Sequence, residues 1–284
     1  MEFIQKNYGK NNQIKMNKKY TIKELKKNNV SLILSGGAAY GISHVGVIKF
    51  LEENNIKPKE ILGTSMGAII GAFYAVGYDS KKIEEILSKI KIKELMKFKL
   101  ISAKLDYKNI YSLFKELFGE KLMSETIIDL KIATTNVDTG ECRLFTKEDN
   151  IKIYDAVFCS MSIPGVFAPV EIEGNYYIDG GVSCNLPLEY AIKDNIKIGI
   201  NVINKTKHYD YHHDGNLFAR LKTAIKILKF TVHFLLENQT KAKIQYINNL
   251  ILIEPDLNKF KKYEIGSYEG LINEGYSEIK KYFE

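Results

Sequence analysis

Residues 30 to 77, VSLILSGGAAYGISHVGVIKFLEENNIKPKEILGTSMGAIIGAFYAVG, decide the fold. The stretch opens with an apolar run, Val30–Leu34, which ends at a glycine-rich turn and predicts a buried parallel strand. Ser43–Asn54 spaces its apolar residues at the period of a helix, Glu60–Gly63 predicts a second short strand, and Met66–Val76 predicts a second, almost wholly apolar helix. Two strand–helix units in direct succession predict an α/β fold with a mainly parallel central sheet flanked by helices.

The chain beyond this stretch contains no internal repeats and no long low-complexity linker. We therefore expect residues 30–284 to form a single domain. Leu217–Leu236 is read as a core-packing helix in preference to a lid or interfacial helix. The other expected elements are amphipathic helices within Lys81–Leu122, a short helix at Ile151–Met161, hairpins at Leu130–Thr146 and Val170–Ile178, and strands at Lys197–Ile203 and Leu250–Glu254.

The charge is concentrated at the N-terminus. The 284 residues include 41 Lys and Arg against 34 Asp and Glu, a net of +7, and residues 1–29 carry eight Lys and two Glu, a net of +6. These residues predict a flexible basic arm, either solubilising or weakly attracted to anionic membrane. The remainder is almost neutral and holds both arginines, Arg143 and Arg220, so we expect no nucleic-acid partner.

Other features of the composition favour a cytoplasmic protein. The three cysteines form no C-x-x-C pair and are too few for a disulfide framework. The N-terminus lacks the apolar core of a signal peptide, and the longest apolar run, Met66–Gly77, is too short to span a membrane.

A candidate nucleophile lies between the second strand and the second helix. Gly63-Thr64-Ser65-Met66-Gly67 matches G-x-S-x-G, whose glycines permit a sharp turn that exposes the serine hydroxyl at a helix N-terminus. The alternative is a tight turn with a serine N-cap. The upstream turn, Ser35 to Gly41, lacks the downstream acidic residue of a dinucleotide site, and its backbone N–H groups fit an oxyanion hole better.

No histidine has the surroundings of a catalytic base for Ser65. His44 is expected to pack or cap a helix, His233 to be a partly buried structural residue, and the group at 208–213 to lie in a surface loop with no common metal-site spacing. Asp179, at the junction of an aromatic strand and paired glycines, is the better candidate, although a turn aspartate bonded to its own backbone remains the alternative.

Taken together, these motifs resemble the patatin-like phospholipase family. Its glycine-rich loop, G-x-S-x-G and D-G-G/A signatures correspond in order to Gly36–Gly41, Gly63–Gly67 and Asp179–Gly181. The segment Ser160–Pro169 is similar to the family's S-x-x-x-P-x-x-F-x-P. The resemblance covers residues 30 to about 205. Two departures are Ala38 in place of the third glycine and Tyr40 in place of the usual Arg or Lys.

The resemblance implies a lipid acyl hydrolase of the phospholipase A or lysophospholipase type, acting through a Ser-Asp dyad and an acyl-enzyme without metal or cofactor. Ser65 would be the nucleophile and Asp179 the base, with a pKa raised by desolvation. Alanine would keep its N–H available if its φ is negative. The implied oxyanion donors are Gly36, Gly37 and Ala38, and the supporting motif residues are Gly41, Gly63, Met66, Gly67, Gly180 and Gly181.

Two other functions remain open at this stage. A soluble esterase or thioesterase would use the same nucleophile on short monomeric substrates. A non-catalytic lipid-binding protein would retain the fold without turnover, and only the departures at Ala38 and Tyr40 favour it.

Overall fold

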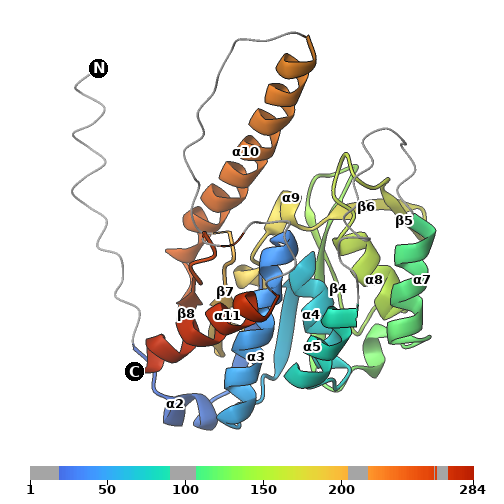
Figure 1. Cartoon of the computed structure of the whole chain (residues 1–284). Helices are drawn as coiled ribbons and strands as arrows, with labels where there is room; N and C mark the ends of the chain where they lie inside the picture. Colours follow the sequence, from blue (N-terminus) through green and yellow to red (C-terminus); the bar gives the residue numbers. More distant parts are fainter. Residues whose placement is uncertain (1–18, 90–106, 204–216, 259, 261–267) are drawn as a thin grey trace, which may run out of the picture.

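The computed structural model describes residues 19–89, 107–203, 217–258, 260 and 268–284. Within these residues an eight-stranded sheet is linked by hydrogen-bonded strand pairs in the sequence β5-β6-β3-β2-β1-β7-β8, and β4 also pairs with β3 (Figure 1). The strands are β1 Val30–Leu34, β2 Glu60–Thr64, β3 Asp129–Asn136, β4 Cys142–Phe145, β5 Val170–Ile172, β6 Asn175–Asp179, β7 Ile196–Ile200 and β8 Leu250–Ile253.

Most of the helices predicted from the sequence are present among the described residues. They are α2 Ile22–Lys27, α3 His44–Glu53, α4 Met66–Ala75, α5 Ser80–Lys89, α7 Tyr107–Phe118, α8 Ile153–Ser160, α9 Gly181–Cys184, α10 Leu217–Ile244 and α11 Tyr268–Phe283, with short 3-10 helices η1 Ala38–Ser43, η2 Met123–Glu125 and η3 Leu188–Tyr190. The strands β1, β2, β3, β7 and β8 run parallel, and β4, β5 and β6 run antiparallel to their neighbours. The predicted α/β class with a mainly parallel sheet is confirmed.

The two faces of the sheet carry cores of different size. Leu32 and Leu34 of β1 belong to the larger apolar cluster, whereas Ile33 between them belongs to the smaller one. Because successive strand residues point to opposite faces, the two clusters lie on opposite sides of the sheet. The larger cluster includes residues of α3, α4, α5, α8 and α11, and the smaller one includes Leu188 of η3 with Ile244 of α10 packed against it.

Three parts of the chain differ from the sequence prediction. The segment assigned to the flexible arm includes α2, in which Leu25 is buried, and residues 1–18 lie outside the described residues. Helix α11 was not predicted, and it packs against α3 with Tyr276 edge-on to Phe50. Helix α10 extends eight residues beyond Leu236, and no described helix is long and apolar enough to cross a membrane.

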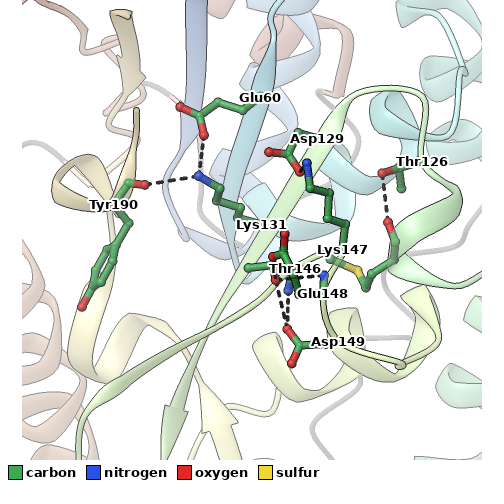
Figure 2. Close-up of polar contacts among 10 residues, drawn as sticks. Glu60, Thr126, Asp129, Lys131, Thr146, Lys147, Glu148, Asp149 and Tyr190 are labelled. Carbon is green, nitrogen blue, oxygen red and sulfur yellow. Dashed lines mark hydrogen bonds and ion pairs between the residues drawn. The ribbon is translucent and has the colours of Figure 1, made fainter. Parts of the chain in front are cut away.

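A buried ion pair joins two strands at the amino-terminal end of the sheet. Glu60 has no exposed side-chain surface, and its carboxylate accepts hydrogen bonds from the Lys131 ammonium at 2.6 Å and from the Ile192 N–H at 2.6 Å. Figure 2 shows the Lys131 ammonium between this carboxylate and the Tyr190 carbonyl oxygen. This pair fixes the sheet at the end opposite to Ser65, which follows the last residue of β2.

Candidate active site

Ser65 occupies a strained turn between β2 and α4. Its φ of 53° and ψ of −119° lie in a region that non-glycine residues rarely adopt, at a cost of about 1–3 kcal/mol. The side chain is almost fully buried, and the backbone carbonyl accepts hydrogen bonds from the N–H groups of Ala68 and Ile69. The serine thus sits at the start of a helix in the conformation of a nucleophile turn.

The glycines that flank this serine allow the helix to approach the sheet closely. A Cβ added at Gly63 would lie 2.5 Å from the Gly67 carbonyl oxygen. A Cβ added at Gly67 would lie 2.7 Å from the Ser35 carbonyl oxygen and would overlap that of Leu34. Both positions exclude a side chain, so the G-x-S-x-G spacing follows from the packing of α4 on β1 and β2.

Asp179 reaches Ser65 because two strands share one edge of β3. At Ile132 and Ala133, β3 pairs with β2 and β4 together, and at Thr134 and Thr135 it pairs with β4 and β6 together. Strands β2 and β6 therefore lie on the same edge, opposite β4. Since β2 ends beside Ala133 and antiparallel β6 ends beside Thr134, their carboxyl ends meet, which brings Ser65 and Asp179 together.

The surroundings of Asp179 make its carboxylate more basic. Burial raises the pKa of Asp179 to about 6. Hydrogen bonds from the Gly181 N–H and the Ser65 hydroxyl have the opposite, smaller effect and lower this pKa. The Gly181 N–H lies 2.7 Å from Oδ1. A Cβ added at Gly180 would overlap the Ala133 carbonyl oxygen, so the turn after the aspartate needs glycine. A base with a pKa near 6 is largely ionised at neutral pH and still able to accept a proton.

The glycine-rich loop lies beside the serine, and its three candidate donors differ. The Gly36 N–H donates to the Asn185 carbonyl oxygen at 3.2 Å. Within the described part of the chain, the N–H groups of Gly37 and Ala38 have no hydrogen-bond acceptor. A Cβ added at Gly36 would lie 3.2 Å from the Ser65 Cβ, so this glycine permits the loop to approach the serine. Gly37 and Ala38 are thus the available donors.

The two departures from the family pattern have distinct structural consequences. Ala38 has a φ of 50°, not the negative φ that the sequence argument required, and a left-handed alanine costs about 1–2 kcal/mol. Its N–H nevertheless has no competing acceptor among the described residues. Tyr40 packs against the larger core and donates its hydroxyl proton to the Phe260 carbonyl at 3.0 Å. Gly41 contacts Met66, since an added Cβ would lie 2.5 Å from the Met66 Cγ.

Two serines that the sequence motifs left without a role support the pair. The Ser160 hydroxyl accepts the Ser65 N–H at 2.9 Å and donates to the Ala133 carbonyl at 2.7 Å. The Ser162 carbonyl accepts the Asp179 N–H at 2.9 Å. The segment Ser160–Pro169 therefore begins by fixing the backbones of both residues. The S-x-x-x-P pattern identified this segment in the sequence. It did not predict these hydrogen bonds, because they depend on how the strands pair.

Asn185 is a further polar residue at the site. It follows α9, its side chain is 1% exposed, and its Nδ2 has no hydrogen-bond partner among the described residues. Its Oδ1 lies 2.8 Å from the Cβ position of Gly36 and 3.5 Å from that of Gly181. The Asn185 side-chain amide therefore lies between the glycine-rich loop and the D-G-G turn. The sequence offered no local signal for this.

The histidines lie elsewhere or have structural partners. His44 is fully buried, its Nε2 lies 2.9 Å from the Ser35 carbonyl oxygen, and burial lowers its pKa to about 4. His233 is half-buried on α10, and the group at 208–213 lies outside the described residues. No cluster of three or more His, Cys, Asp or Glu side chains suited to a metal ion occurs in the described ranges.

The sequence model described as patatin-like phospholipase matches residues 32–192. The chain is 31% identical over 244 residues to the uncharacterized protein R571 of Acanthamoeba polyphaga mimivirus, covering 78% of each chain. It is 24% identical to lysophospholipase nte1 of Emericella nidulans, across 90% of this chain but 18% of that much longer protein. Among solved structures, VipD from Legionella pneumophila shares the fold, with a TM-score of 0.51 and 15% identity over 90% of this chain and 66% of VipD.

Proposed function

Because the chain belongs to the patatin-like phospholipase family, we propose that it hydrolyses acyl esters of phospholipids or lysophospholipids, with Ser65 as nucleophile and Asp179 as general base. The observation that carries the proposal is the meeting of the carboxyl ends of β2 and β6 on one edge of β3. It sets a strained, buried serine beside a carboxylate whose pKa burial raises to about 6. The lysophospholipase name of one relative supports the substrate class.

The first half of the reaction forms an acyl-enzyme. The Ser65 Oγ attacks the ester carbonyl carbon while its proton passes to the Asp179 carboxylate. The N–H groups of Gly37 and Ala38 donate to the oxygen that becomes negative. When the tetrahedral intermediate collapses, the bond to the alcohol oxygen breaks and Asp179 returns the proton to that oxygen.

The second half of the reaction restores the serine. A water molecule attacks the acyl carbon and gives its proton to Asp179, and the bond to Ser65 Oγ then breaks as Oγ recovers a proton from Asp179. Fatty acid is released. The role of Asp179 alternates between base and acid, for which a pKa of about 6 suits it better than the ordinary aspartate value near 4.

The test compares wild type, Ser65→Ala and Asp179→Asn on a panel of phospholipids and lysophospholipids, with released fatty acid and lysolipid as readout. A fluorophosphonate probe reports the nucleophile directly, and Ser88→Ala, which changes an exposed serine of α5, is the matched control. We expect labelling and hydrolysis in wild type and Ser88→Ala and neither in Ser65→Ala. Equal labelling of Ser65→Ala would exclude Ser65 as the nucleophile.

The same experiment separates the two alternative functions. A soluble esterase or thioesterase would hydrolyse short monomeric esters and leave phospholipids intact. A lipid-binding protein without turnover would neither label nor release fatty acid in its wild-type form.

A further inference from the structure

Several described aliphatic residues of helix α10 are exposed, although Leu236 and Ile244 of the same helix pack against the two cores. Among its described side chains, the buried ones are polar, since Glu237 is 6% and Thr240 is 4% exposed. Three of its aliphatic residues face outward instead: Ile227 is 40%, Val232 is 48% and Leu235 is 60% exposed. A helix that covers a core turns its apolar residues inward. The expected core-packing role therefore does not explain Ile227, Val232 and Leu235.

These aliphatic residues form one face of the helix. At 3.6 residues per turn, Ile227, Val232 and Leu235 fall within an arc of about 140°, and Glu237 and Thr240 lie on the opposite side. We call these three residues the exposed apolar face of α10. Scattered exposed aliphatic residues are ordinary on protein surfaces, whereas three on one face of a helix form an apolar surface that a partner can cover.

Helix α10 adjoins the candidate active site through residues next to the exposed apolar face. Leu236 lies 3.8 Å from the Cβ position of Gly181, two residues after Asp179. Gln239 accepts the Asn185 N–H at 2.9 Å and donates to the Ser183 carbonyl at 2.5 Å, which fixes α10 to α9. Val182 of α9 is itself an exposed aliphatic residue. Figure 1 shows α10 extending from this region away from the sheet.

The charge of α10 indicates the kind of partner. Its sequence carries six basic residues and one acidic residue, a net of +5, in a chain whose total is +7. Lys241 pairs with Glu237 and Lys243 with Glu189, and the other four basic residues, Arg220, Lys222, Lys226 and Lys229, precede them in the sequence of the helix. A helix that combines an apolar face with clustered Lys and Arg is suited to lie at the surface of an anionic bilayer, where the aliphatic groups enter the acyl region and the cations meet lipid phosphates.

We propose that the exposed apolar face of α10 docks on an anionic phospholipid surface and so places Ser65 beside the lipid. The inference extends the proposed function, because it identifies how substrate in a bilayer reaches the site. Docking itself requires no catalysis, and the two can be tested apart.

The experiment measures flotation of the full chain with vesicles of phosphatidylcholine and phosphatidylglycerol, in the Ser65→Ala background so that no lipid is consumed. The test variant adds Val232→Ser and Leu235→Ser. The matched control adds Ile127→Ser and Ile192→Ser, two exposed aliphatic residues near the amino-terminal ends of β3 and β7. We expect the test variant to bind vesicles about tenfold or more weakly and the control to bind like its parent.

Three results would overturn the docking inference: no vesicle binding by the parent, equal binding by parent and test variant, or equal loss in the control. Sedimentation of the same proteins tests whether a second copy of the chain occupies the face instead. The face would be assigned to a second copy if the parent is a dimer, the test variant is a monomer, and both bind vesicles equally.

Turnover of a soluble short-chain ester, measured with Ser65 intact, separates this inference from the proposed function. Equal ester turnover with reduced vesicle binding supports both. Absent turnover in wild type alongside reduced vesicle binding in the test variant would reject only the catalytic proposal.

Discussion

The Ser160 hydroxyl accepts a hydrogen bond from the Ser65 N–H at 2.9 Å and donates one to the Ala133 carbonyl at 2.7 Å. A single side chain thus joins the strained serine turn to β3, whose next residue, Thr134, pairs with Asp179. Because the hydroxyl is fully buried, bulk solvent does not reach the two backbone groups that it bonds.

We expect Ser160→Ala to lower kcat for phospholipid hydrolysis by about 10- to 100-fold, because the turn that aims Ser65 loses its fixed partner. Two buried backbone groups lose a hydrogen bond, which should reduce the free energy of unfolding by about 1–3 kcal/mol. Ser162→Ala is the control, since that hydroxyl donates to the Phe158 carbonyl within the adjoining helix. A fall in kcat as large for Ser162→Ala would contradict a specific role for Ser160.

Asn185→Ala should lower kcat by about tenfold while KM changes little, because a buried amide beside the glycine-rich loop can donate to the developing oxyanion. Asn195→Ala provides the comparison, since Asn195 is also buried but bonds Ser31 at the amino-terminal end of the sheet. Steady-state kinetics and urea unfolding of both variants distinguish the cases. If both lose stability alone and keep kcat, Asn185 is structural.

The pH dependence should report Asp179. Because the base must be ionised, kcat/KM for a soluble ester should fall about tenfold per pH unit below a pKa of about 6. An initial-rate profile from pH 4.5 to 8 measures this. A profile that remains flat down to pH 4.5 would contradict a raised pKa in the free enzyme.

The free energy of unfolding should also depend on Asp179, but it should fall as the pH rises, whereas kcat/KM rises. The folded state holds its proton up to about pH 6 and the unfolded state only to about 3.8, so this contribution to the free energy of unfolding falls as pH rises through that interval. We expect Asp179→Asn to be inactive but more stable than wild type at pH 7, by up to about 3 kcal/mol. Urea unfolding at pH 4 and 7 should show the difference only at the higher pH.

Ala38→Gly should stabilise the protein by about 1 kcal/mol, because glycine adopts the φ of 50° without the cost that alanine bears. The donor N–H is retained, so esterase activity should be unchanged or higher. The neighbouring Ala39→Gly should have the opposite effect on stability, since Ala39 does not have a positive φ. Chemical denaturation of the two variants measures both signs.

Lys131→Met should reduce the free energy of unfolding by about 3–5 kcal/mol, because it leaves the fully buried Glu60 carboxylate without its cation (Figure 2). The double variant with Glu60→Gln should recover part of this loss. Since the pair lies at the end of the sheet opposite to Ser65, we expect the folded fraction to keep wild-type kcat.

Local pattern predicted most of the fold. The helices and strands between Val30 and Ala75 agree with their predicted limits within one or two residues, because their apolar periods and flanking glycines are properties of short segments. Local pattern does not predict helix α2, because four of its six residues are charged and the burial of Leu25 depends on packing in the core. Leu236 and Ile244 of α10 pack against the two cores, as the prediction of a core-packing helix requires, but an apolar pattern does not reveal that Ile227, Val232 and Leu235 are exposed.

The sequence by itself determined the strand–turn–helix units, the glycines at positions where the backbones pack closely, and the order of Ser65 and Asp179 along the chain. Each of these follows from local sterics and spacing. Tertiary structure alone decided that β2 and β6 share one edge of β3, that the Asn185 carbonyl accepts the Gly36 N–H, and that three aliphatic residues of α10 are exposed. These three features depend on contacts between segments that are distant in the sequence. Local pattern allows several arrangements of those segments, and the pairing and packing of the whole sheet select one of them.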